Sequence, residues 1–214
     1  MIKAGAARLR SLGPWRATLA LTLAVAVLHL LAAGRVPLSA DEAHYALYGL
    51  HRDWSYFDHP PLVGWLQAGV QFFASSDFAL RLWPIGLSAA TSLVLFRFAR
   101  RLFPGESEWL AFWTVVLYQS GLLFQALGLA LVPETPLLLF ALLGMLALLK
   151  ALESERLIDW LLFGLCIGLA GLSKYTAVTL VFTAALFVIL QQRLDVLRTP
   201  GPWLAVALAL LLIA

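Results

Sequence analysis

Long apolar runs fill most of this 214-residue chain, and they constrain its fold more than any other feature. They cover residues 17–34, 78–98, 109–130, 136–150, 158–172, 175–191 and 202–214. A membrane-spanning helix needs about 20 apolar residues, within a range of about 17–25. Only 13% of the residues are charged and 62% are hydrophobic, which excludes an ordinary soluble domain. The sequence therefore predicts an all-α integral membrane protein, a polytopic helix bundle with about six to seven spans.

The run from 158 to 191 is too long for one crossing, because at ~1.5 Å per residue it would reach about 50 Å. We expect it to break at Ser173-Lys174-Tyr175 into two short helices. If it does not break, Lys174 lies in the middle of a helix and its side chain snorkels to the interface. Because the last run stops in apolar sequence at Ala214, we expect residues 1–214 to be the N-terminal part of a longer transmembrane domain.

The basic residues are distributed unevenly between the two sides of such a bundle. With a cytoplasmic N-terminus, the segments outside the cytoplasm contain only Arg35, Arg52, Arg81 and Lys174. The cytoplasmic segments contain Lys3, Arg8, Arg10, Arg16, Arg97, Arg100, Arg101, Lys150, Arg156, Arg193 and Arg198. The positive-inside rule therefore predicts a plasma membrane (bacterial inner membrane) protein whose long first loop, residues 35–77, faces the periplasm or exterior.

This loop begins with a helix start signal. Ser39 followed three residues later by Glu42 fits a capping box, with a short helix to about Gly49. In that arrangement Glu42 is structural and Asp41 is the free carboxylate, kept ionised by the helix dipole. His44 and Tyr45, three and four residues after Asp41, share its face of the helix. An ionised carboxylate beside an imidazole and a phenol can deprotonate a hydroxyl or bind a cation.

The later part of the loop contains Asp58-His59-Pro60-Pro61. Two prolines fix the backbone after His59, and an interfacial helix over about 62–74 is expected to follow. A protonated His59 can neutralise a phosphate, while Asp58 can orient it or bind a metal; an ordinary solvated histidine is an equal alternative.

Two more charged residues, Glu134 and Lys174, fall at outward helix ends. Three chain segments thus bring charge to one membrane face, which favours a shared cavity over simple solvated turns.

With these residues in view, the chain resembles the GT-C glycosyltransferases of family 39. That family includes protein O-mannosyltransferases and the aminoarabinose or mannose transferases that use polyprenyl-phosphate sugars. The matching segments are DEAHYA at 41–46, YFDHPPLVGW at 56–65, RLFPG at 101–105, PETPLLLF at 133–140 and GLSKYTA at 171–177. They occur in the family order and extend over most of the chain.

The resemblance implies an inverting glycosyltransferase in which the acidic pair Asp41 and Glu42 is catalytic, with Asp41 as the general base. It implies that the donor phosphate is bound by His59, His44, Lys174 and Tyr175. Asp58 and Glu134 are candidates for a supporting or metal-binding role, and the sequence leaves the metal unknown and any divalent cofactor open. Many relatives have Glu-Lys in place of Asp58-His59 and Arg in place of His44, so phosphate binding here is expected to depend on pH.

The implied partners are a polyprenyl-phosphate-linked sugar, an acceptor lipid, glycan or protein, and membrane lipids, with no nucleic acid. Two alternatives stay open. A polytopic transporter would place charges at the bilayer midplane and contain inverted repeats, and neither is visible in the sequence. A catalytically inactive family member that binds lipid would retain the fold without the reaction.

Overall fold

The computed structural model describes residues 12–214; Lys3, Arg8 and Arg10 of the predicted charge bias lie outside them. The described residues form helices and contain no β-strand. The first half contains α2 (Pro14–Ala33), α3 (Ala40–Leu50), α4 (Leu62–Gln71), α5 (Asp77–Leu80), α6 (Leu82–Leu102), α7 (Glu108–Ser120) and α8 (Leu122–Leu129). The second half contains α9 (Glu134–Ser154), α10 (Leu157–Ser173), the 3₁₀ turn η1 (Tyr175–Ala177), α11 (Val178–Leu190), the 3₁₀ turn η2 (Leu194–Arg198) and α12 (Pro200–Ile213).

Within residues 12–214, three helical segments are long and apolar enough to cross a membrane: Pro14–Ala33, Asp77–Leu102 and Glu134–Ser154. Helices α7 and α8 together meet the same criteria, although they are bent against each other. Three shorter apolar helices follow, Leu157–Ser173, Tyr175–Leu190 and Pro200–Ile213. These segments match the six to seven spans expected, and the predicted all-α membrane bundle is confirmed.

The break predicted at Ser173-Lys174-Tyr175 is present. Helix α10 ends at Ser173, and Lys174 adopts an extended conformation with φ −155° and ψ 138°. Lys174 therefore lies between two helices, and the alternative of a snorkelling side chain within one long helix is wrong.

The segment 109–130, which was predicted as one straight span, is broken. Helices α7 and α8 meet at Gly121 and are bent by 75°. Gly121 is extended, with φ −75° and ψ 124°, and does not continue either helix. The expectation of a single span over 109–130 rested on the apolar character of the run. It did not take into account the amides on either side of the break, Gln119 and Gln125.

These amides join a buried chain of hydrogen bonds. Gln119 donates from Nε2 to Ser92 Oγ on α6 at 2.6 Å, and Gln125 donates from Nε2 to Gln119 Oε1 at 3.0 Å. His29 of α2 lies with Nε2 2.8 Å from Gln125 Oε1. A helix can break at membrane depth only where other groups satisfy the polar atoms that are released, and this chain supplies them.

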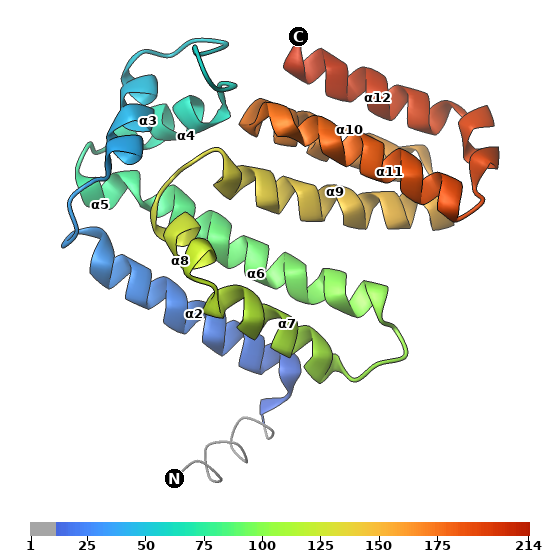
Figure 1. Cartoon of the computed structure of the whole chain (residues 1–214), viewed down its shortest axis with the longest axis horizontal. Helices are drawn as coiled ribbons and strands as arrows, with labels where there is room; N and C mark the ends of the chain where they lie inside the picture. Colours follow the sequence, from blue (N-terminus) through green and yellow to red (C-terminus); the bar gives the residue numbers. More distant parts are fainter. Residues whose placement is uncertain (1–11) are drawn as a thin grey trace.

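The helices lie side by side, and α6 links the two halves of the bundle (Figure 1). Helix α6 packs against α2, α7, α8 and α9, while α10 packs against α9 and α12. At one end, α3, α4 and α5 form a cap where α2 ends, α6 and α9 begin and α10 ends (Figure 1). This cap gathers the predicted site residues at a single end of the bundle.

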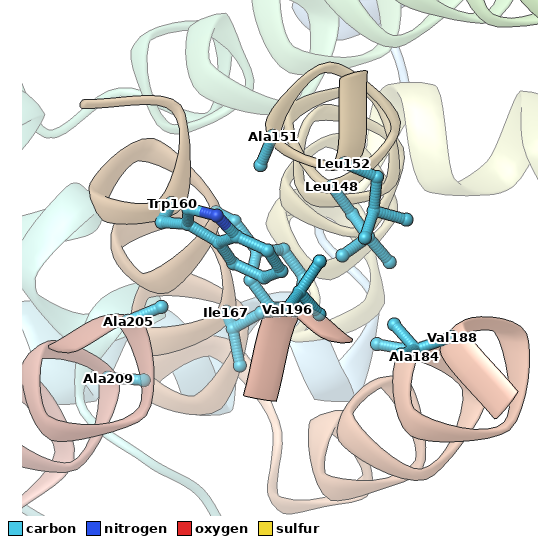
Figure 2. Packing of buried hydrophobic residues seen from close by; sticks show 11 residues of the cluster. Leu148, Ala151, Leu152, Trp160, Ile167, Ala184, Val188, Val196, Ala205 and Ala209 are labelled. Carbon is cyan, nitrogen blue, oxygen red and sulfur yellow. The ribbon is translucent and has the colours of Figure 1, made fainter. Parts of the chain in front are cut away.

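The second half is held by an apolar cluster around Trp160 (Figure 2). Trp160 at the start of α10 is 4% exposed and lies between Ala151 of α9 and Ala205 of α12. Val188 of α11 and Val196 of η2 complete the cluster. An indole buries a large apolar area, so Trp160 contributes strongly to the packing of α10 in this cluster.

Small residues let α10 approach α12 closely. A Cβ atom at Gly164 would collide with the backbone of Ala205, and one at Gly168 would meet Leu212 and Ala209. Helices in membranes commonly associate through such small residues, because lipid removes the hydrophobic driving force between them.

Candidate functional site

The first catalytic candidate, Asp41, lies in the first turn of α3. The predicted capping box is present: Glu42 N donates to Ser39 Oγ at 3.3 Å, and Ser39 N donates to Glu42 Oε2 at 2.9 Å. The helix ends at Leu50, one residue beyond the expected Gly49. Asp41 is exposed, and within residues 12–214 its carboxylate has no hydrogen bond or ion pair.

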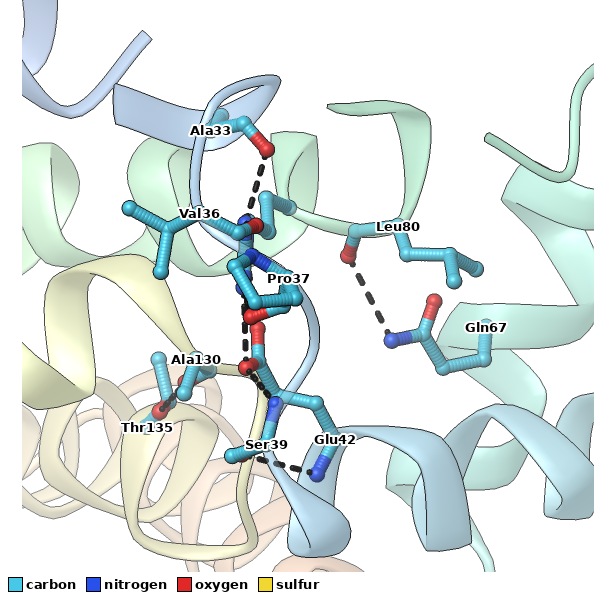
Figure 3. A network of polar contacts seen from close by, with 10 residues as sticks. Ala33, Val36, Pro37, Ser39, Glu42, Gln67, Leu80, Ala130 and Thr135 are labelled. Atoms are coloured by element: carbon cyan, nitrogen blue, oxygen red, sulfur yellow. Dashed lines mark hydrogen bonds and ion pairs between the residues drawn. The ribbon is translucent and has the colours of Figure 1, made fainter. Parts of the chain in front are cut away.

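Glu42 has a different environment, because Arg81 binds it. Arg81 is 1% exposed and donates from Nε to Glu42 Oε1 at 2.7 Å and from Nη2 to Oε2 at 3.0 Å. Its remaining N–H groups donate to the carbonyl oxygens of Ala33 at 2.7 Å, Val36 at 2.6 Å and Pro37 at 3.1 Å. Figure 3 shows these backbone segments gathered beside Glu42 and Ser39. Both carboxylate oxygens of Glu42 are therefore occupied.

Burial by itself would raise the pKa of Glu42, but the hydrogen bonds from Arg81 and from the Ser39 backbone outweigh it and hold the pKa below its ordinary value. Arg81 thus stabilises the ionised form of Glu42. In the sequence, Arg81 was considered only as a positive charge outside the cytoplasm. No local pattern around Arg81 or Glu42 indicates that these two residues pair.

Asp58 lies between two histidines. Tyr48 donates its hydroxyl proton to Asp58 Oδ1. His44 Nε2 lies 2.8 Å from the Tyr48 hydroxyl oxygen, so His44 is the donor in that contact. His44 Nε2 and His59 Nε2 each lie 3.6 Å from Asp58 Oδ2, beyond hydrogen-bonding range but close enough for ion pairing. The structure therefore brings His44, Asp58 and His59 together as predicted, and adds Tyr48.

The hydrogen bond from Tyr48 lowers the pKa of the Asp58 carboxyl below its ordinary value, and the charge of His59 adds to this against the opposing effect of burial. Asp58 is consequently ionised at neutral pH. It serves as a fixed negative charge that can hold an imidazolium on either side.

The loop that carries Asp58 is stiffened by stacked tyrosines. Tyr56 lies parallel to Tyr48, with ring centroids 3.7 Å apart and an interplanar angle of 2°. The Tyr56 hydroxyl donates to the Tyr48 carbonyl at 2.8 Å. Gly64 of α4 lies directly under the Tyr56 ring, where a Cβ atom would collide. The loop is therefore fixed by packing as well as by the two prolines.

Tyr45 is a buried tyrosine of α3 that lies beside His59. It is 7% exposed, and its ring centroid is 5.6 Å from that of His59. The pKa of its phenol is raised to about 12, first by burial and then by nearby carboxylates. These carboxylates belong to Asp58, Asp41 and Glu134. Tyr45 therefore remains protonated, and carboxylates from three separate segments contribute negative charge to its surroundings.

Glu134 and Lys174 form an ion pair between the start of α9 and the end of α10. The start of α9 is fixed by Thr135, whose hydroxyl donates to the carbonyls of Leu127 at 3.1 Å and Ala130 at 3.2 Å. The sequence predicted both charges at this end without predicting that they would pair.

Tyr175 follows Lys174 and is exposed. Its hydroxyl lies 3.4 Å from Ser55 Oγ, which joins the first loop to η1. The loop also exposes Trp54 and Phe57, which are 80% and 106% exposed. The three predicted segments thus meet at one end of the bundle and form a polar cluster with aromatic edges.

The metal-binding candidates Asp58 and Glu134 are engaged by Tyr48 and Lys174 respectively. Among residues 12–214, no set of three or more His, Cys, Asp or Glu side chains is arranged to hold a metal ion.

The chain is thus a membrane helix bundle with carboxylates, imidazoles and an ammonium group gathered at one end. Residues 58–214 match the family described as dolichyl-phosphate-mannose-protein mannosyltransferase. This match covers most of the chain, and the chain belongs to that family. Asp41, Glu42 and His44 precede the matched range.

A solved structure has the same fold. The chain matches the S. cerevisiae protein O-mannosyltransferase Pmt1-Pmt2 complex bound to the sugar donor, with a TM-score of 0.68 and 20% identity. The match covers 97% of this chain and 33% of that one, so this chain spans about a third of the length of the solved relative. No curated protein sequence matches the chain. The predicted GT-C fold is confirmed.

Proposed function

We propose that the protein transfers a sugar from a polyprenyl-phosphate donor to the hydroxyl group of an acceptor lipid, glycan or protein. The reaction takes place at the α3–α4 end of the bundle, on the periplasmic or exterior face of the plasma membrane, with inversion at the anomeric carbon. Family membership and the sugar donor named for the yeast complex support this class of donor.

The observation that carries the proposal is the contrast among the four carboxylates at this end. Glu42 is bound by Arg81, Asp58 by Tyr48, and Glu134 by Lys174. Within the described part of the chain, the Asp41 carboxylate alone among these four has no such partner. A general base must be able to accept a proton from a substrate, and a carboxylate already bound by a cation accepts it less readily.

Three cationic or protonatable groups from different segments are available for the donor phosphate: His59, His44 and Lys174. Lys174 approaches from the end of α10, whereas both histidines flank Asp58. In the resting protein these groups are balanced by Glu134 and Asp58, so a bound phosphate would compete with two carboxylates for them. This arrangement keeps the cations in place before the donor arrives.

In the proposed step, the Asp41 carboxylate removes the proton of the acceptor hydroxyl. The acceptor oxygen forms a bond to the anomeric carbon while the bond from that carbon to the phosphate oxygen breaks. The electron pair leaves with the polyprenyl phosphate, which gains one negative charge. His59, His44 and Lys174 offset this charge, and Tyr175 can donate a hydrogen bond from the side of the loop. Removing one such group from a transition state typically lowers the rate about 10²–10³-fold.

The test is the Asp41→Asn variant of the whole gene product in detergent. Asparagine keeps the size and exposure of the side chain but cannot accept the proton, so transfer is expected to fall to background while expression and monodispersity are unchanged. Asp77→Asn is the matched control, because Asp77 is also an exposed aspartate in the first turn of a helix at this end. Wild-type turnover in Asp41→Asn would remove Asp41 from the role.

The donor class is tested separately by native mass spectrometry of the whole gene product. We expect a co-purifying polyprenyl phosphate or its sugar adduct, whose added mass limits the identity of the sugar. A protein that carries no such lipid and does not take up added polyprenyl phosphate would favour the transporter alternative. Uptake of the lipid without turnover would favour the inactive lipid-binding alternative.

A further inference from the structure

A basic cavity lies at the opposite end of the bundle from the candidate site. It is formed where α2 begins and α6 ends, and it has a volume of about 460 Å³. Its lining consists of Trp15, Phe96, Arg97, Arg100 and Arg101. Among residues 12–214, no acidic side chain lines it. It is separated from the α3–α4 end by the length of α6, which is 21 residues.

The apolar wall of this cavity is firmly packed. The Trp15 and Phe96 rings lie with centroids 5.3 Å apart. Phe96 is 2% exposed and belongs to a buried cluster with Ala17 of α2 and Phe112 of α7. The guanidinium carbon of Arg97 lies 5.5 Å from the centroid of the Trp15 ring, within range of a cation–π interaction. Trp15 is therefore held between α2 and α6 and carries a positive charge over its face.

The three arginines are not equivalent. Arg100 pairs with Glu108 at 2.7 Å, and Arg101 pairs with Glu153. Within residues 12–214, Arg97 has no carboxylate partner. Basic residues in the last turn of a helix complement its dipole, which accounts for Arg100 and Arg101. The helix dipole explains neither the cavity nor the position of Arg97, which lies one turn earlier and packs over the Trp15 ring.

An apolar track leads from the cavity along α2. Leu19 and Leu23 follow Trp15 at intervals of four residues, so all three lie on one face of the helix. Leu19 is 39% exposed and Leu23 is 66% exposed. A ligand with a phosphate at the arginines could therefore place an acyl chain along this face.

From these observations we infer that the cavity binds the headgroup of an anionic glycerophospholipid. The phosphodiester is bound by Arg97 with Arg101 and Arg100 beside it, Trp15 lies at the level of the headgroup, and one acyl chain follows Leu19 and Leu23. Basic pockets between membrane helices are recognised binding sites for anionic headgroups. This inference does not rest on the proposed function, since the cavity and the candidate site share no residue.

The test is native mass spectrometry of the full chain in detergent, titrated with phosphatidylglycerol or with phosphatidylcholine that has the same acyl chains. We expect tighter binding of phosphatidylglycerol to the wild type. Arg97→Gln should weaken it about fivefold and Arg97→Gln with Arg101→Gln about 25-fold, since each basic residue contributes a similar factor. Arg198→Gln is the matched control, because Arg198 is an exposed arginine that does not line the cavity.

Two further arms make the result decisive. Glycerol phosphate is added as a competitor: if it displaces phosphatidylglycerol at equal concentration, the cavity is a site for soluble phosphate and the lipid assignment is wrong. Arg97→Lys keeps the charge and should retain most of the binding. Size-exclusion profiles and helical circular dichroism show that each variant is folded. Equal binding of both lipids, or unchanged binding in the folded double variant, would overturn the inference.

Discussion

The α3–α4 end and the α10–α12 layer are stabilised by different interactions. At the α3–α4 end a few directional contacts fix the structure: Arg81 with Glu42, Tyr48 with Asp58, and Lys174 with Glu134. In the α10–α12 layer the helices meet through glycine and alanine around Trp160. Polar groups near a membrane need specific partners, whereas apolar helices in lipid gain mainly from close contact. We therefore expect the stability of the α3–α4 end to depend on charge, and that of the α10–α12 layer to depend on side-chain volume.

The largest effect on stability is expected from breaking the charge network with Arg81→Met. This change leaves the buried Glu42 carboxylate and three backbone carbonyls without their donor. Breaking a buried ion pair from one side typically costs about 3–5 kcal/mol. We expect a clear fall in the midpoint of thermal unfolding, measured by the loss of the main size-exclusion peak in detergent.

The control for this prediction is the double variant Arg81→Met with Glu42→Met. It removes the uncompensated charge and should recover part of the lost stability. If the double variant is as unstable as the sum of the two single variants, the pair is not coupled and the charge-sensitive view of this end is wrong.

A smaller effect is expected from adding volume in the α10–α12 layer with Gly164→Ala. The new methyl group collides with the backbone of Ala205, which cannot move as a side chain can. Overpacking of this kind typically costs about 1–3 kcal/mol. Gly86→Ala is the matched control on α6, where nothing lies within 4 Å of the added Cβ; alanine there should stabilise by about 0.5–1 kcal/mol. Equal behaviour of the two variants in thermal unfolding would contradict close packing between α10 and α12.

The smallest effect concerns acid stability and the Tyr48→Phe variant. The pKa of Asp58 is lowered in the folded protein, so the ionised carboxylate stabilises the fold. This stabilisation is fully present above the ordinary pKa of about 3.9 and is lost as the pH falls through the pKa of the folded protein. Removing the Tyr48 hydroxyl raises the pKa of Asp58 toward that ordinary value. The variant should be less stable than the wild type at pH 6, and the difference should shrink below about pH 4.

This effect stays small because the Asp58 side chain is 42% exposed and solvent screens its charge. Thermal unfolding is compared from about pH 3 to pH 7. Tyr56→Phe is the control: it also loses a hydroxyl from the stacked pair, but that hydroxyl binds a carbonyl and not a carboxylate. A difference between Tyr48→Phe and wild type that does not change with pH would show that Tyr48 does not act through Asp58.

The features predicted correctly from the sequence depend on neighbouring residues. The capping box of Ser39 and Glu42 spans three residues, and the break at Lys174 follows from the length of an apolar run. The grouping of Asp58 with His59 follows from their adjacency and the prolines after them. Such signals can be read locally, because the backbone geometry that they require is formed within one turn of chain.

The features that were missed depend on residues far apart in the chain. Arg81 and Glu42 are separated by 39 positions, and neither has a local signal for the other. Tyr48 was not singled out in the sequence, although it binds Asp58. Tyr45 was expected to share the Asp41 face of its helix, but not to lie beside His59. The bend at Gly121 had a readable signal in Gln119 and Gln125, whose polar side chains are unusual within an apolar run.

The Arg81 network also determines where the chain can be modified for topology mapping. Because Arg81 donates hydrogen bonds to the carbonyls of Ala33, Val36 and Pro37, the short connection between α2 and α3 is held in place although most of its residues are exposed. An epitope inserted there would pull these carbonyls from their donor. The α6–α7 connection around Gly105 is exposed and has open space around it, so a cysteine or short tag should be accepted there. Reagent labelling at Gly105 therefore offers a way to determine on which side of the membrane the opposite, α3–α4 end lies, without disturbing that end.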